Sequence, residues 1–524
     1  MILTDWEGIW MEKWFVAMKK ADFNGIAEKY QISPIIARLM RNRDVIGDEA
    51  IDFYLNGTVE DLYDGLLMKD MDRAVDILKE KIEEGKKIRV IGDYDIDGVN
   101  ATYILQQGLA GLGADVDTDI PDRIKDGYGL NQMLIDRALE DDIDTIITCD
   151  NGIAAMNEIA YGKENGMTIV VTDHHEVPYL EENGEKKYLL PPADAVVDPH
   201  RADCEYPFKG LCGAAVAYKL VEVLYRVSGK SEQEVEHLQE RLMENVAIAT
   251  IGDVMDLVGE NRVFVKKGLE LLKTTKNEGL HALMQCTGVD TANLNTYHIG
   301  FVIGPCINAG GRLDTAKRAL ELLNASNRRE AVTLAADLKE LNDSRKEMTE
   351  EGVEEAVQIE SSSWKDDQVL VVYLPKCHES IAGIIAGRIK ERYYRPTFVL
   401  TKGETGVKGS GRSIESYSMY EKLCECKEYL TKFGGHPMAA GLSLEEENVE
   451  RFRRKLNEQS GLTEEDLVEK VTIDVPMPIS YITKNLIRQI ALLEPFGKGN
   501  TKPVFAQKNL RVLDHSIIGK NKNV

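Results

Sequence analysis

Three aspartates alternate in one short segment of the sequence. The stretch VIGDYDIDGVNA, from Val90 to Ala101, places Asp93, Asp95 and Asp97 between an apolar run and a glycine. Like charges this close repel one another, and at the end of a buried strand they are also partly desolvated. A positive group should therefore neutralise them. A divalent metal ion is the first candidate, and other parts of the chain must supply its remaining ligands.

Further acids and imidazoles follow two other apolar runs. Asp150 comes directly after TIITC, and Asp173, His174 and His175 come directly after TIVVT. Carboxylate oxygens combined with imidazoles, without thiolates, suit Mn²⁺ or Mg²⁺ better than a structural zinc ion. A pair of such ions can activate a water and stabilise the leaving oxygen of a displacement at phosphorus.

Each of these signals also has a purely structural explanation. An EF-hand calcium loop begins DxDxDG, but here the position of its closing glutamate falls at Tyr103 or its neighbours. Asp150 alone could cap a helix, and His174 and His175 could be a hydrogen-bonded core pair. The combination on three consecutive strand ends is harder to explain by structure alone, so it predicts a metal site.

The apolar runs predict the elements that position these side chains. Continuous Val/Ile runs alternate with helical segments, which indicates an α/β fold with a doubly wound, mainly parallel sheet buried on both faces. In such sheets ligands bind beyond the carboxyl ends of the strands. The acids and imidazoles all follow strands, so we expect them to meet at one rim.

The sequence divides into five predicted parts. A long charged stretch with apolar residues at helical spacing predicts a linking helix between two α/β domains, and the last part resembles a partial β-barrel that the chain does not complete. The predicted parts are an N-terminal helical cap over 1–71, the first α/β domain over 72–326, the linking helix over 327–362, a smaller α/β domain over 363–460, and a β domain over 466–524.

Composition excludes some classes of function and leaves others open. The 524 residues contain no apolar run long enough to span a bilayer and no GxxxxGK[ST] loop for ATP. The eight cysteines form no CxxC pair, which fits a reducing compartment, so we expect a cytoplasmic protein that contacts no membrane. The net charge of −24 argues against nucleic acid, but residues 376–440 carry 11 Lys or Arg against 7 Glu. An acidic body can therefore present a basic groove.

At this point the motifs resemble a known family. DYDIDG, CDNGI, TDHHE and IGDVMDL are similar to the successive motifs of the DHH phosphoesterase superfamily. GPCINAGGR and FGGHPMAAGLSL resemble its RecJ branch of single-strand-specific 5′ exonucleases. The resemblance implies that the first α/β domain is the catalytic DHH domain, that the second is the DHH-associated domain, and that the C-terminal part is OB-like.

The resemblance also implies roles for individual residues. His175 would meet the scissile phosphate. Asp97 is grouped with it as a catalytic candidate, and its role is left open between an acid that orients the ligands and a helix cap. Asp198, in VVDPHR, is interpreted as a structural or ligand-supporting acid. Two ions, Mn²⁺ or Mg²⁺, would be held by Asp93, Asp95, Asp150, His174 and Asp253, with Asp150 bridging.

Substrate binding is assigned to two further groups of residues. The INAGGR motif offers an amide, two glycines that allow close approach, and a guanidinium that suits phosphate. The KGSGRS and FGGHP motifs of the second domain offer further donors opposite the metals. The predicted substrate-binding residues are Asn308, Arg312, Ser410, Arg412, Gly435 and His436.

The resulting hypothesis is a metal-dependent exonuclease that shortens single-stranded DNA stepwise from its 5′ end, in repair and recombination. A single-strand-binding protein or a helicase is an expected partner, and the oligomeric state is left open. The alternatives are a phosphodiesterase for short oligonucleotides or cyclic dinucleotides and a non-catalytic scaffold that binds single strands. A DHH pyrophosphatase fits least, because the chain is much longer than so small a substrate requires.

Overall fold

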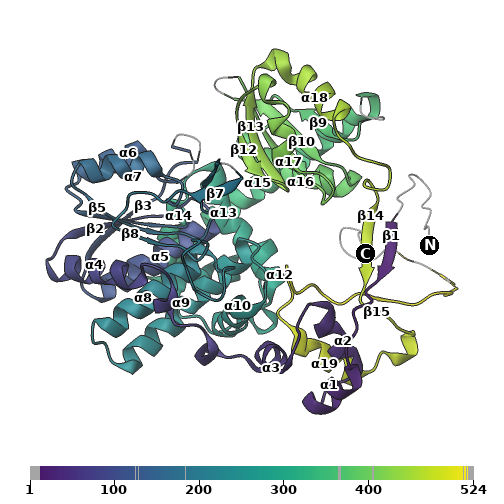
Figure 1. Cartoon of the computed structure of the whole chain (residues 1–524), viewed down its shortest axis with the longest axis horizontal. Coiled ribbons are helices and arrows are strands. Elements are labelled where there is room, and N and C mark those ends of the chain that lie inside the picture. Colours follow the sequence, from purple (N-terminus) through teal and green to yellow (C-terminus); the bar gives the residue numbers. More distant parts are fainter. Residues whose placement is uncertain are drawn as a thin grey trace. The chain divides into compact units, whose positions relative to one another are not determined.

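The computed structural model describes residues 12–511 except 124, 125, 128, 183, 364–366, 404 and 405, together with 513, 514 and 516. The chain forms two compact units (Figure 1). One unit comprises Met1–Asn56, Val468–Phe496 and Asn500–Val524, and the other comprises Gly57–Leu467 and Gly497–Gly499. The predicted domain boundaries stay predictions.

The larger unit contains a five-stranded sheet in which all neighbouring strands are parallel, in the order β3-β2-β4-β5-β8. Four of its strands are short runs rich in Val, Ile and Thr, as buried parallel strands require, while the edge strand β3 reads DVDTD and is partly exposed. They are β2 (Lys87–Ile91), β3 (Asp115–Asp119), β4 (Thr145–Cys149), β5 (Thr168–Thr172) and β8 (Ala195–Val197).

Both faces of this sheet are buried except along the edge strand β3. Ile147 of β4 belongs to one hydrophobic core and its neighbour Ile146 to another, because successive side chains of a strand point to opposite faces. One core contains residues of α4 (Met71–Glu83), α5 (Ile96–Gly111) and α8 (Gly213–Val227), and the other contains residues of α6 (Gln132–Glu140) and α7 (Met156–Glu164). The predicted doubly wound architecture is confirmed.

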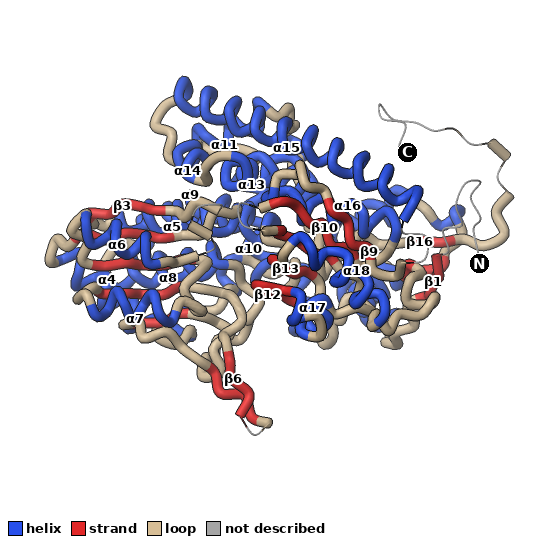
Figure 2. Tube along the Cα trace, turned by 90° about the horizontal axis from the view of Figure 1, so that it is seen from above, coloured by secondary structure: helices blue, strands red, loops and turns tan. Residues whose placement is uncertain are grey.

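Further helices extend the first core and lead to a second domain within the same unit. They are α9 (Glu232–Gly252), α10 (Gly259–Leu272), α11 (Glu278–Cys286), α12 (Thr296–His298), a π-helical turn (Ile299–Ile303), α13 (Gly304–Leu313) and α14 (Lys317–Leu323). The predicted linking helix is confirmed as α15 (Arg328–Ser363), the long blue helix labelled in Figure 2.

The second domain is a mixed sheet with the order β12-β13-β11-β10-β9. Only β9 and β10 pair in parallel. Its elements are β9 (Leu370–Tyr373), α16 (Ala382–Tyr393), β10 (Thr397–Lys402), β11 (Val407–Arg412), α17 (Met419–Cys424), β12 (Leu430–His436), β13 (Ala439–Leu444) and α18 (Val449–Glu458). The predicted second α/β domain is confirmed.

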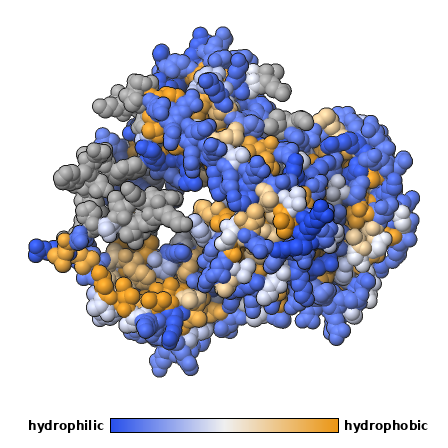
Figure 3. All heavy atoms as spheres, turned by 180° about the vertical axis from the view of Figure 1, so that it is seen from behind, coloured by the Kyte–Doolittle hydropathy of each residue, from blue (hydrophilic) through white to orange (hydrophobic). Residues whose placement is uncertain are grey.

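A two-stranded hairpin of β6 (Tyr179–Glu182) and β7 (Glu185–Tyr188) projects from the first domain (Figure 2). The face in Figure 3 is mostly hydrophilic, with apolar side chains gathered in patches. Of the helices that the structure describes, none is both long enough and apolar enough to cross a bilayer.

The smaller unit joins the two ends of the chain. It contains β1 (Glu12–Val16), α1 (Phe23–Tyr30), α2 (Pro34–Asn42), α3 (Asp48–Asn56), β14 (Glu469–Ile473), β15 (Val475–Pro476), α19 (Lys484–Ile490) and β16 (Phe505–Ala506). β1 pairs in parallel with β14, and β15 with β16. The described residues of this unit form no closed barrel, which fits the partial barrel predicted from the sequence.

Candidate active site

Two strand ends bring three acids together. Asp93 follows β2 and Asp150 follows β4, the neighbouring strands between which the chain order of the sheet reverses. Asp95 caps the start of α5, where its side chain accepts hydrogen bonds from the backbone N–H groups of Asp97 (2.9 Å) and Gly98 (3.1 Å). One ligand oxygen from each of Asp93, Asp95 and Asp150 lies within 4.8 Å of the others.

A second cluster forms around His174. Its Nε2 lies 3.0 Å from Asp150 Oδ1, 3.5 Å from Asp97 Oδ2 and 3.9 Å from Asp253 Oδ2. Asp253 is contributed by a helix and not by a strand end: it lies at the C-terminal end of α9. The structure therefore brings together the five predicted metal ligands.

Asp150 belongs to more than one cluster of possible ligands. It groups with Asp93 and Asp95 on one side and with His174 and His175 on the other. This is the arrangement that a bridging carboxylate between two ions requires. All donors are carboxylate oxygens or imidazole nitrogens, so the residues present fit two Mn²⁺ or Mg²⁺ ions.

The electrostatics of the clusters also favour cations. Burial, together with the charge of Asp95, raises the pKa of Asp93 well above its usual range. Burial and the neighbouring carboxylates also raise the pKa of Asp150 well above its usual range. The same two causes raise the pKa of Asp253 to about 8. Burial lowers the pKa of His174, which favours the neutral imidazole that a metal needs. A divalent ion would stabilise the charged carboxylates.

Asp97 has a structural partner far away in the sequence. Its Oδ2 accepts a hydrogen bond from the backbone N–H of Gly213 (2.6 Å), and its Oδ1 accepts one from Ala214 (2.8 Å), at the start of α8. Both oxygens thus bind the positive end of a helix. This geometry favours the capping alternative for Asp97, which still lies beside His174.

Asp173 positions His175. Its Oδ1 lies 2.7 Å from His175 Nδ1, and its Oδ2 accepts a hydrogen bond from the backbone N–H of Ile153 (2.9 Å). Burial lowers the pKa of His175, but the hydrogen bond and charge of Asp173 outweigh that effect and raise the pKa to about 9. The Asp173 carboxylate therefore favours the protonated imidazole, and 41% of the His175 side chain is exposed.

Asp198 lies at the end of the next strand, β8. Its Oδ1 accepts a hydrogen bond from the backbone N–H of His200 (2.7 Å), and burial followed by the charge of Asp173 raises its pKa to about 8. Asp198 belongs to none of the groups of possible metal ligands among the described residues. This position is compatible with the supporting role predicted for it.

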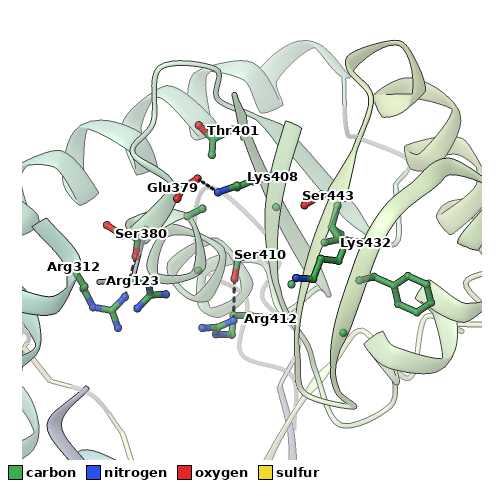
Figure 4. A pocket seen from close by; sticks show the side chains of 17 residues that line it. Arg123, Arg312, Glu379, Ser380, Thr401, Lys408, Ser410, Arg412, Lys432 and Ser443 are labelled. Carbon is green, nitrogen blue, oxygen red and sulfur yellow. Dashed lines mark hydrogen bonds and ion pairs between the residues drawn. The ribbon is translucent and has the colours of Figure 1, made fainter. Parts of the chain in front are cut away.

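A cavity of about 480 Å³ lies between the two domains of the larger unit. Figure 4 shows the side chains of Arg123, Arg312 and Arg412 beside one another on one side of it. Arg312 Nη1 donates to the backbone carbonyl of Ser380 (2.9 Å). Burial and the neighbouring arginines lower the pKa of Arg312 to about 10 and also lower that of Arg412. An anion would relieve this repulsion.

The cavity adjoins the acids. Gly311 precedes Arg312, and a Cβ at Gly311 would lie 2.4 Å from the backbone oxygen of Tyr94, the residue between Asp93 and Asp95. The cation cluster and the acid cluster are therefore neighbours in one unit. Such a pair of features suits a phosphodiester, which needs cations on its oxygens at both the scissile and the neighbouring phosphates.

The other predicted substrate residues lie in different places. Ser410 lines the cavity, and its Oγ accepts a hydrogen bond from Arg412 Nη1 (3.3 Å). Asn308 instead uses its Oδ1 to accept from the backbone N–H of Ile96 (2.9 Å), so it holds the start of α5. Gly435 and His436 lie at the end of β12, outside the set of described residues that line the cavity.

Four site residues were given no role by the sequence. Asp173 was expected at the rim as the first acid of TDHHE but without a function, and Arg123 could have been found from its place shortly after a strand end. Lys408 and Lys432 gave no local signal, because a lysine in a strand is usually a solvated side chain. They line the cavity because β11 and β12 belong to one sheet.

Comparison with protein families agrees with this architecture. Residues 87–250 match the DHH family, N-terminal domain, residues 366–461 match the DHHA1 domain, and residues 473–524 match the RecJ OB domain. With the acid and imidazole clusters at the rim of the sheet, these matches define a metal-dependent phosphoesterase of the DHH class.

Individual relatives define the family more narrowly. The chain is 37% identical to the single-stranded-DNA-specific exonuclease RecJ of Bacillus subtilis over 95% of its length, and it spans 61% of that protein. It is 33% identical to RecJ of Salmonella typhimurium, covering 93% of this chain and 85% of that one. The chain belongs to the RecJ family of single-stranded-DNA-specific exonucleases.

A solved structure supports the same conclusion. RecJ of Thermus thermophilus in complex with Mn²⁺ superimposes with a TM-score of 0.81 at 29% identity, over 94% of this chain and 69% of that one. Both curated relatives are longer than this chain, most clearly the Bacillus subtilis protein.

Proposed function

We propose that this chain is a metal-dependent exonuclease that removes nucleotides stepwise from the 5′ end of single-stranded DNA, in DNA repair and recombination. One observation carries the proposal. A cluster of carboxylates and imidazoles that suits two divalent ions adjoins a cavity with three convergent arginines in the same unit. Family membership supports the choice of substrate, because relatives at 32–37% identity are named as single-stranded-DNA-specific exonucleases.

The proposed metal ligands are Asp93, Asp95, Asp150, His174 and Asp253. When bound, two Mn²⁺ or Mg²⁺ ions would supply Lewis acidity, which activates a water and neutralises charge at phosphorus. The chain presents these side chains from the loops that follow β2, β4 and β5, from the start of α5 and from the C-terminal end of α9.

His175 and Asp173 are proposed to act on the phosphate. The His175 imidazole, protonated through its pair with Asp173, can donate a hydrogen bond to a non-bridging oxygen. Such a donor stabilises charge that develops in the transition state. Asp173 is a positioning residue, because it fixes which ring nitrogen carries the free proton.

Arg312, Arg412 and Ser410 are proposed to bind the phosphate next to the scissile one, at the end of the strand. A cavity of about 480 Å³ is of the size that holds one small ligand, so it can take a terminal nucleotide but not a duplex. This size supports single-strand specificity, and the family resemblance supports the 5′ direction. A helicase or a single-strand-binding protein that presents such ends is a fitting partner, and the cytoplasmic location stays a prediction.

The test is hydrolysis of a single-stranded DNA labelled at its 3′ end, with Mn²⁺ or Mg²⁺, beside a blunt duplex and a five-nucleotide oligomer. We expect a ladder that shortens from the 5′ end on the single strand alone, and its loss in Asp150→Ala. Cleavage confined to the short oligomer would instead assign the chain to small substrates. Tight binding of the strand without cleavage under either metal would make it a scaffold.

A further inference from the structure

A second cavity, of about 540 Å³, lies among the helices of the first domain. Its lining comes from α5, α9 and α10, from the connection between α10 and α11, and from the connection between α14 and α15. None of its described lining residues also lines the arginine cavity. The volume suits a small molecule, and the activity proposed above makes no use of this cavity.

The second cavity is separate from the acid cluster, although the two share helices. Tyr103 lines the cavity from α5, eight residues after Asp95, and Glu244 lines it from α9, nine residues before Asp253. Such separations correspond to about 12–14 Å along a helix axis. A molecule in this cavity would therefore contact the helices that carry proposed metal ligands without contacting the ligands themselves.

Glu244 is a buried carboxylate in the wall of this cavity. Only 7% of the residue is exposed, and its Oε2 accepts a hydrogen bond from Thr275 Oγ1 (2.6 Å). Among the residues that the structure describes, none donates a hydrogen bond to its Oε1, and no Lys or Arg forms an ion pair with it. Burial raises the pKa of Glu244 to about 7, against the opposing effect of the Thr275 hydrogen bond. Buried carboxylates are normally paired with a cation, and this one has none within the described chain.

The charges around Glu244 leave room for one further cation. The other titratable side chains of the lining, apart from Tyr103, are exposed: His237, Glu240, Arg241, Lys276 and Glu278. Arg241 Nη2 donates to Gln107 Oε1 (3.3 Å), and Glu278 lies 3.7 Å from the guanidinium of Arg328. Apart from the imidazole, three carboxylates face two cations, so the lining has one carboxylate in excess. The buried one, Glu244, is the carboxylate for which an added cation would gain most.

The surroundings of Glu244 also indicate which kind of cation fits. Thr275 already occupies Oε2, so one oxygen is left, which suits the compact charge of an ammonium better than the two-pronged fork of a guanidinium. Leu323, which is buried, and Leu271, which is partly buried, give the cavity an apolar wall. Glu244 belongs to none of the described groups of possible metal ligands. An organic ammonium with a short apolar body therefore matches the cavity better than a metal ion.

We propose that this cavity is a binding site for a small primary alkylamine. The ammonium group donates a hydrogen bond to Glu244 Oε1, and the alkyl chain packs against Leu271 and Leu323. The carboxylate then holds its charge against a partner of opposite sign, in a setting where a charge-assisted hydrogen bond is strong. This inference is independent of the proposed function, because none of the residues that it uses takes part in the proposed hydrolysis.

The test is titration of the full chain with n-butylammonium, followed by saturation-transfer difference NMR. Excess Mg²⁺ is present throughout, so that the acid cluster does not attract the amine. We expect saturable binding of n-butylammonium and none of n-butanol, which has the same alkyl chain but no charge. In Glu244→Gln the Kd of the amine should rise about tenfold or more, because a hydrogen bond between charged groups is lost. Equal binding of the amine and the alcohol, or an unchanged Kd in this variant, would overturn the inference.

The matched control is Glu240→Gln. It makes the same chemical change in the same cavity, one turn earlier on α9, but at an exposed carboxylate. Because exposed charges interact weakly through water, the Kd of the amine should stay within about twofold. An equal rise of Kd in both variants would mean that the acidic surface attracts the amine without a specific site.

A second variant keeps the inference testable if Glu244→Gln does not fold. Ala325 lines the cavity and is partly buried, so Ala325→Leu narrows the space while the carboxylate of Glu244 is retained. Binding of n-butylammonium should be lost in Ala325→Leu if the amine occupies the cavity. Binding that is unchanged in this variant would place the amine elsewhere on the chain and would overturn the inference.

Discussion

At the scale of single residues, the pair of Asp173 and His175 gives the sharpest prediction. Asp173→Asn keeps the shape of the side chain but removes the charge that holds the His175 proton. The new amide has one oxygen, which can accept a hydrogen bond either from His175 or from the backbone N–H of Ile153, whereas the carboxylate serves both. We expect kcat on single-stranded DNA to fall about 100-fold. Mn²⁺ binding, measured by titration calorimetry, should change less than kcat, because Asp173 itself is outside the described ligand clusters and only its partner His175 belongs to one.

Asp198→Asn provides the control for that variant. It makes the same chemical change in another buried acid at the end of the neighbouring strand, where the partner of the carboxylate is the backbone N–H of His200. Its kcat should remain within about threefold of the unchanged chain. An equal loss in both variants would mean that general electrostatics, and not the positioning of His175, accounts for the effect.

Some contacts of the site residues could be predicted from the sequence, and others could not. Asp93, Asp150 and His174 could be predicted to meet because each follows a strand of one parallel sheet. Helix capping was one expected role of Asp97, but the helix that it caps, α8, could not be predicted, because its partners Gly213 and Ala214 are far away in the sequence. The sequence around a carboxylate that lies next to metal ligands does not indicate from which backbone N–H groups it will accept hydrogen bonds.

At the scale of elements, the contact between α8 and the loop after β4 controls the metal site. A Cβ at Gly213 would lie 2.7 Å from Asp150 Cβ and 3.0 Å from its Cα, and Asp150 already has φ 59°. Gly213→Ala must therefore displace the Asp150 carboxylate, the ligand proposed to bridge the two ions. We expect a loss of Mn²⁺ affinity of about tenfold to 100-fold by calorimetry, with a parallel loss of exonuclease activity.

Gly108→Ala is the matched variant on the neighbouring helix α5. Its added methyl would meet Val221 of α8 at 2.5 Å, so it crowds α8 at a point away from the acid cluster. It should destabilise the chain by about 1–3 kcal/mol through overpacking, while Mn²⁺ affinity stays unchanged. If both variants bind Mn²⁺ equally well, Gly213 does not control Asp150.

The elements themselves were predictable where the hydrophobic pattern was strong. Strands β2, β4, β5 and β8 of the first sheet follow from continuous Val/Ile segments, and the long helix α15 follows from helical spacing. The edge strand β3, DVDTD, has no such run. The pairing of β1 with β14 was not predictable, because it joins residues near the two ends of the chain and strand register depends on tertiary contacts. The π-helical turn under Phe301 also has no sequence signature.

At the scale of the whole molecule, the smaller unit is built from both ends of the chain. Its core combines Ile36, Leu39 and Ile51 from the first helices with Leu486 and Leu493 from the C-terminal part. Polar contacts add to it. Tyr54 donates a hydrogen bond to Asn500 Oδ1 (2.9 Å), and the backbone N–H of Ser33 donates to Gln489 Oε1 (2.9 Å). Neither part has a core of this size alone.

Deletion of residues 1–56 should therefore unfold the C-terminal part without unfolding the larger unit. The remaining chain would expose the apolar side chains of α19 to water, at about 25 cal/mol for each Å², and a segment this short cannot bury them by itself. Hydrogen exchange should show lost protection after residue 468, with the strands of the first sheet still protected and Mn²⁺ binding retained. Ile36→Ala should produce a weaker form of the same local loss, because it removes part of the shared core. Protection after residue 468 that survives the deletion would mean that this part folds independently and that the two ends of the chain do not depend on one another.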